Sequence, residues 1–72
     1  MRRAILEALR AKYEAEIAEA YAVADIYLDN SVGIGEHPQH IEEVNKQVEK
    51  IANAKEKLEV LDEFEPERGT QL

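Results

Sequence analysis

Apolar residues recur every three or four positions along two long segments of the chain. The stripe of the first segment consists of Leu6, Leu9, Tyr13, Ile17, Ala20, Ala24 and Tyr27. This spacing is typical of one face of an α-helix, and the abundance of Ala, Glu, Leu and Arg favours the same conformation. Further apolar residues beside the stripe are Ile5, Tyr21, Val23, Ile26 and Leu28. They widen the apolar face, which indicates contacts with more than one neighbour.

The second segment has a narrower apolar stripe. It consists of Ile41, Val44, Val48, Ile51, Leu58 and Leu61. The middle of this stripe is weak, because Ala54 is small and Lys55 holds the strict heptad position. We expect Lys55 to bury its aliphatic stem and to keep its ammonium group in water. The opposite face carries mixed Glu and Lys residues, which is typical of a solvated helix surface.

Glycine and proline separate the two segments. The connection contains Gly33 and Gly35, and Pro38 suits the first turn of a second helix, where its missing N–H costs nothing. The sequence therefore predicts an all-α fold, an antiparallel two-helix hairpin over residues 1–65. The expected ranges are a helix over about 2–29, a turn over 30–38, a helix over about 39–64 and a flexible tail over 66–72.

A second copy of the chain is the simplest partner for such a hairpin. The single interface between two Ala-rich helices, which we call the seam, buries little apolar surface. Folding must nevertheless order about 50 residues. We therefore expect a two-fold homodimer that forms a four-helix bundle. The residues expected to make intermolecular contacts are Tyr13, Ile17, Tyr21, Ala24 and Leu28 on the first helix, with Val32 and Ile34 in the turn.

Length and charge restrict the classes of function. The 72 residues allow one small domain, and the formal net charge is −7. An acidic chain is poorly suited to direct contact with nucleic acid or with an anionic membrane, and no apolar run is long enough to span a bilayer. The absence of cysteine excludes disulfides, thiolate metal sites and cysteine nucleophiles. Together these features favour a cytoplasmic protein.

Candidate chemistry along the chain is sparse. His37 and His40 are three residues apart and form a weak candidate metal site, because no third ligand is evident and His37 precedes the second helix. Gly33 and Gly35 do not continue into a phosphate-binding glycine motif. Ser31 is the only serine and lacks a nearby base–acid pair. We therefore expect no cofactor, no bound metal and no enzymatic activity.

The stretch DIYLDNSVGIGEHP at residues 25–38 is distinctive. With IEEV at 41–44 and IANAKEKL at 51–58, it resembles small acidic proteins encoded by tailed bacteriophages, including marine cyanophages. The resemblance covers roughly residues 25–61, about half of the chain. It implies a turn between two helical segments and expression in the cytoplasm of a bacterial host. It implies no catalytic residues, because this family has no assigned activity.

Three functions remain open from the sequence. The first is a non-enzymatic structural or protein-interaction module, a dimeric hairpin that binds itself or another protein. The second is an acidic decoy of a nucleic-acid-binding protein, which the net charge of −7 favours and the interspersed lysines oppose. The third is a metal-binding module that uses His37 and His40.

Overall fold

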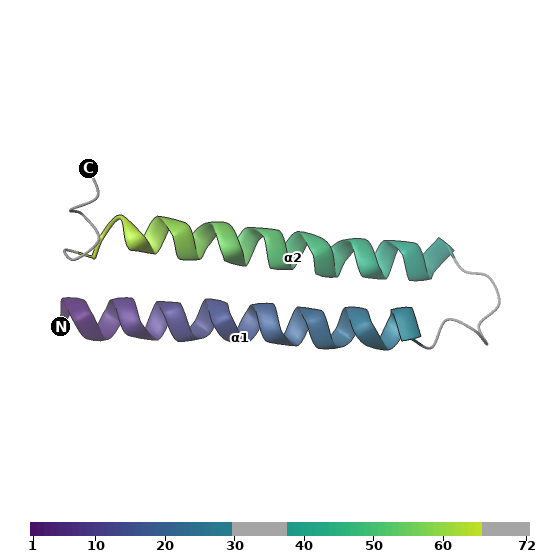
Figure 1. Cartoon of the computed structure of the whole chain (residues 1–72), viewed down its shortest axis with the longest axis horizontal. Coiled ribbons are helices and arrows are strands. Elements are labelled where there is room, and N and C mark those ends of the chain that lie inside the picture. Colours follow the sequence, from purple (N-terminus) through teal and green to yellow (C-terminus); the bar gives the residue numbers. More distant parts are fainter. Residues whose placement is uncertain (30–37, 66–72) are drawn as a thin grey trace.

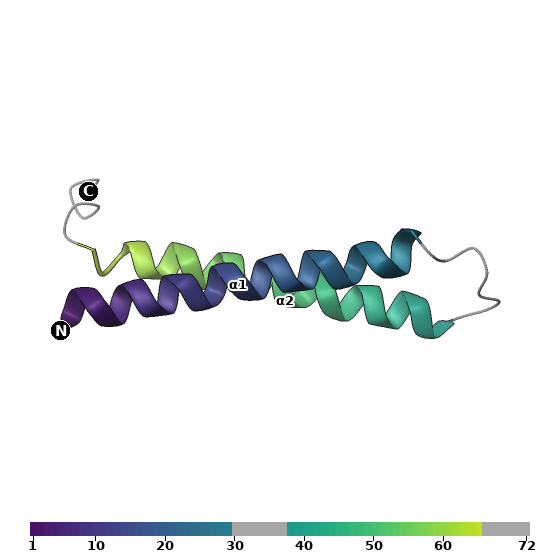
Figure 2. The ribbon, with the colours of Figure 1, turned by 90° about the horizontal axis from the view of Figure 1, so that it is seen from below.

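The chain folds into two antiparallel α-helices that lie side by side (Figure 1). Helix α1 spans Arg2–Asp29 and helix α2 spans Pro38–Asp62. The all-α helical hairpin predicted from the sequence is confirmed. In a second view the two helices cross at a shallow angle (Figure 2), so each helix contacts the other along most of its length.

A computed structural model describes residues 1–29 and 38–65. The predicted turn contacts Val32 and Ile34, the candidate ligand His37 and the predicted tail 66–72 lie outside the described residues. We call the end where Asp29 and Pro38 lie the connected end of the hairpin. The end where α1 begins and α2 finishes is the open end (Figure 1).

The helix boundaries follow from local chemistry. Helix α1 covers the range expected from the sequence, whereas α2 begins one residue earlier and finishes two residues earlier than expected. The first turn of a helix tolerates proline because its backbone N–H groups have no partner within the helix. After Asp62 the chain forms a tighter turn, in which the Phe64 N–H donates to the Leu61 carbonyl at 2.9 Å. This three-residue spacing is the usual way to satisfy the last carbonyl groups of a helix.

The face of α1 that contacts α2 is the stripe expected from the sequence. Ala20 and Ala24 are buried, and the other five members of the stripe are half-buried. Ala20 retains only 1% of its exposed surface, and Ala54 on α2 likewise retains 1%. Small side chains at the centre of the seam let the two backbones approach closely.

The face of α2 differs from the expected stripe. The residues that face α1 are His40, Val44, Gln47, Ile51, Ala54, Leu58 and Leu61. Their spacing alternates between four and three residues, the heptad pattern of paired helices. The prediction that Ile41 and Val48 lie in the seam is wrong, because these side chains are 74% and 53% exposed.

The correction has a physical reason. Positions 41, 48, 55 and 62 form one column along α2, and positions 40, 47, 54 and 61 form the neighbouring column. The first column includes a lysine and an aspartate, whose burial costs far more than the burial of Gln47. Helix α2 therefore turns Ala54 and Gln47 into the seam, and Lys55 is exposed beside Tyr21. Among the described residues, no buried side-chain nitrogen or oxygen lacks a hydrogen-bond partner.

Candidate functional site

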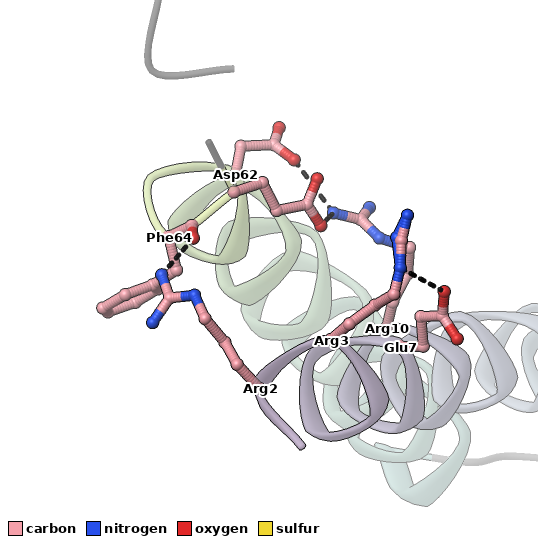
Figure 3. A network of polar contacts seen from close by, with 7 residues as sticks. Arg2, Arg3, Glu7, Arg10, Asp62 and Phe64 are labelled. Atoms are coloured by element: carbon pink, nitrogen blue, oxygen red, sulfur yellow. Dashed lines mark hydrogen bonds and ion pairs between the residues drawn. The ribbon is translucent and has the colours of Figure 1, made fainter. Parts of the chain in front are cut away.

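Ionic contacts hold the open end of the hairpin together (Figure 3). The Arg10 guanidinium donates to Glu65 at 2.8 Å and to Asp62 at 3.0 Å. These two hydrogen bonds, first that to Glu65 and then that to Asp62, raise the pKa of Arg10 above its ordinary value. Because the pKa is raised, titration of Arg10 itself removes this contact only in strongly alkaline solution. Arg2 adds a hydrogen bond to the Phe64 carbonyl.

Two columns of residues spaced by seven run along one flank of the hairpin. Seven residues make almost two full helical turns, so the members of a column share one face. The α1 column is Glu7, Glu14, Tyr21 and Leu28, and the α2 column is Ile41, Val48, Lys55 and Asp62. The Lys55 ammonium donates to the Tyr21 hydroxyl at 3.3 Å, and Leu28 and Ile41 line the same hollow. These contacts place both columns on the same flank.

The connected half of this flank is apolar. Tyr21, Leu28, Ile41 and Val48, which we call the apolar flank, are between 46% and 74% exposed. At its end lies a hollow of about 430 Å³. The hollow is lined by Tyr27, Leu28, His40, Ile41, Val44 and Asn45. Large apolar side chains that are exposed next to one another are typical of a surface that binds another protein.

The opposite flank is more polar, although Ile26 is exposed on it. Its hollow, of about 330 Å³, is lined partly by Glu16, Glu19, Lys50, Asn53 and Lys57. The acids of this hollow come from α1 and its lysines from α2, and Lys12 pairs with Glu16 nearby at 3.2 Å. Such mixed charges are typical of a hydrated surface. The two flanks of the described hairpin therefore differ in chemistry, and the apolar flank is the candidate site.

Aromatic rings fill the edges of the seam. Tyr27 and His40 pack edge to face, with their ring centres 5.3 Å apart and their planes at 78°. Lys57 lies over the ring of Tyr13 at 5.4 Å from its centre. Both contacts join α1 to α2, so these tyrosines contribute to packing between the helices.

The predicted contact residues of α1 divide between the seam and the surface. Ala24 is buried in the seam, and Tyr13 and Ile17 are half-buried along it. Tyr21 and Leu28 are exposed on the apolar flank, so they are the members of this set that remain accessible to a partner.

Sequence reasoning did not assign Ile41 and Val48 to this surface. Both were placed in the seam because they are strongly apolar. The signal that identifies them is the column spaced by seven residues, in which they precede the charged residues Lys55 and Asp62.

The candidate metal site is only half described. Within residues 1–29 and 38–65, no three His, Asp or Glu side chains gather in a way that would hold a metal ion. His40 packs against Tyr27 and lines the hollow beside Ile41. His40 therefore lies next to the apolar flank.

No protein-family model, curated protein or solved structure matches the chain. In the described parts of the chain, neither helix has an apolar stretch long enough to cross a membrane.

Proposed function

We propose that the protein is a non-enzymatic protein-interaction module that forms a homodimer through its apolar flank. The exposure of Tyr21, Leu28, Ile41 and Val48 on one flank is the observation that carries this proposal. In the dimer, the flanks of two hairpins pack together and form a four-helix bundle. A second copy covers the apolar side chains that the hairpin leaves in water.

The composition of the seam supports a second copy as the partner. Three of the four buried apolar residues that the structure describes are alanines: Ala20, Ala24 and Ala54. An alanine buries little apolar surface, and domains of this size often gain stability by oligomerisation. A stable interface usually covers about 800 Å² on each partner. The apolar flank and the small residues beside it offer a surface along two helices for such an interface.

The setting of this module is also a proposal. The resemblance of residues 25–61 to small phage proteins suggests a phage-encoded protein in the cytoplasm of a bacterial host. There the dimer would act as a structural element or as an adapter for another protein. Basic residues are interspersed among the described acids, as in the pair of Lys46 and Glu43 at 3.4 Å. This mixture is less suited to mimicry of the continuous negative charge of a nucleic acid.

The proposal predicts that Ile41→Glu separates the dimer. Ile41 is 74% exposed in the hairpin, so the substitution leaves the seam intact. In the dimer it removes an apolar contact and introduces a carboxylate, and we expect the dissociation constant to rise at least about tenfold. Sedimentation equilibrium over a range of protein concentrations measures this change.

The matched control is Ile26→Glu. Ile26 is 59% exposed and lies seven residues after Glu19, on the side of the polar flank. We expect this variant to dimerise like the unchanged protein. A monomeric mass for the unchanged chain at high micromolar concentration would contradict the proposal, as would equal weakening by the two substitutions.

A further inference from the structure

The flank that carries the proposed interface changes its chemistry halfway along the hairpin. Leu28 and Ile41 lie at about the same level, because they line one hollow and the preceding residues, Tyr27 and His40, pack ring against ring. The helices are antiparallel and rise equally per residue, so each step of seven residues leads from one level to the next. The four levels, from the connected end to the open end, are Leu28 with Ile41, Tyr21 with Val48, Glu14 with Lys55, and Glu7 with Asp62.

The charged levels differ in how their charges are neutralised within one hairpin. At the open end, Asp62 accepts from Arg10 at 3.0 Å, and Glu7 lies 3.9 Å from Arg3. At the third level, Glu14 makes no ion pair within the described residues, and the Lys55 ammonium contacts the hydroxyl and the ring of Tyr21. The third level therefore carries two opposite charges that are not paired with each other.

Two copies can bring their flanks together with the connected ends at the same end of the dimer. The two-fold axis then runs parallel to the helices and places α1 of each copy opposite α2 of the other. Each residue therefore faces, in the other copy, the residue that shares its level. Leu28 faces Ile41, and Tyr21 faces Val48. Glu14 faces Lys55 of the copy, so opposite charges meet on both sides of the axis. At the last level, the acids that face one another already have arginine partners.

The antiparallel alternatives match the surface less well. With full overlap, Glu14 faces Tyr21 and Lys55 faces Val48, so each charge lies against an apolar group and loses water without a partner. With overlap of the apolar halves alone, Tyr21 faces Leu28, but the remaining half of each flank makes no contact. That arrangement covers about half the surface of the other two.

We propose that the dimer is parallel, with both connected ends at the same end and Glu14 of each copy paired with Lys55 of the other. This inference rests on the proposed dimer, and it adds the orientation of the partner and the residues that select it. The two apolar levels bury apolar surface between the copies, and the charges of the third level select the parallel orientation.

Distances between spin labels test the orientation directly. The chain has no cysteine, so Ala8→Cys and Ala22→Cys each give a single labelling position. Both alanines are exposed and lie on the outer face of α1, away from the seam. In the parallel dimer, Ala8 and Ala22 each lie at the level of their own counterpart. Double electron–electron resonance should therefore give similar distances at the two positions.

The antiparallel arrangements predict unequal distances. With overlap of the apolar halves alone, the labels at position 8 are separated along the axis by about 50 Å and those at position 22 by about 8 Å. With full overlap the separations along the axis are about 28 and 14 Å. Either unequal pattern would overturn the parallel orientation while leaving the dimer intact. The absence of dipolar coupling at both positions, as expected for labelled Ile41→Glu, would instead overturn the dimer.

A charge reversal tests the pair that selects this orientation. Glu14→Lys is expected to weaken the dimer about threefold to tenfold, because lysine then faces Lys55 on both sides of the axis. The double variant with Lys55→Glu should restore the original dissociation constant. Circular dichroism of each variant separates this effect from changes in the hairpin itself. Weakening by the single substitution without recovery in the double variant would overturn the pairing of Glu14 with Lys55.

Discussion

Replacement of Leu61 by alanine is expected to lower the free energy of unfolding by about 2–4 kcal/mol. Leu61 is 5% exposed and is the largest of the buried apolar side chains that the structure describes. The others are alanines, so the deleted methyl and methylene groups are a large part of the buried apolar volume. For a chain of this size the total stability is about 4–10 kcal/mol. The loss therefore removes a substantial fraction of the stability.

Urea unfolding followed by circular dichroism measures this loss, at one protein concentration for all variants because the proposed dimerisation would shift the apparent stability. Val60→Ala is the matched control, since Val60 precedes Leu61 but is 44% exposed. We expect the control to change stability by less than about 0.5 kcal/mol. Similar losses for the two variants would show that Leu61 does not pack in the seam as described.

Ala20→Leu is expected to destabilise the hairpin by about 1–3 kcal/mol. Ala20 is 1% exposed, and Ala54 of the other helix, which lines the same hollow, is equally buried. A leucine at this position moves the helices apart or extends into the polar hollow that Ala20 and Ala54 line, and either change disturbs the packing of the seam. The substitution removes the close approach that the two alanines allow.

The control for this effect is Ala22→Leu, which makes the same chemical change on the exposed face of α1. Leucine and alanine both favour helices, so the control should stay within about 0.5 kcal/mol of the unchanged protein. Thermal unfolding of both variants gives the comparison. An increase in stability for Ala20→Leu would mean that the seam has room for a larger side chain.

The sequence was sufficient to predict the fold and the buried face of α1. In that helix every position of the stripe from Leu6 to Tyr27 is apolar, whereas the columns beside it include acids such as Glu14 and Glu16, so the stripe is the face to bury. Ala20 and Ala24 illustrate this, because both lie in the predicted stripe and both are buried. The regular spacing and the glycines between the two segments were enough to indicate a hairpin.

The buried face of α2 was harder to predict, because two adjacent columns compete for the seam. Hydrophobicity alone selects Ile41 and Val48, whereas the structure buries Gln47 and Ala54. The decisive residue is Lys55, which lies in the same column as Ile41 and Val48. A helix buries a whole column and not single residues, so burial of these two apolar side chains would also bury Lys55. For the same reason, the sequence predicts only the α1 members of the apolar flank, Tyr21 and Leu28, and not its α2 members, Ile41 and Val48.

The hairpin also has an expected order of assembly. Residues that meet at the connected end are close in sequence, such as Tyr27 and His40, whereas Arg10 and Asp62 are 52 positions apart at the open end. The entropy lost when two positions are brought together grows with the length of chain between them. Contacts near the connected end are therefore expected to form first and to open last. The apolar flank lies in that half, so in the proposed dimer the two copies would stay joined while their outer ends unravel and close again.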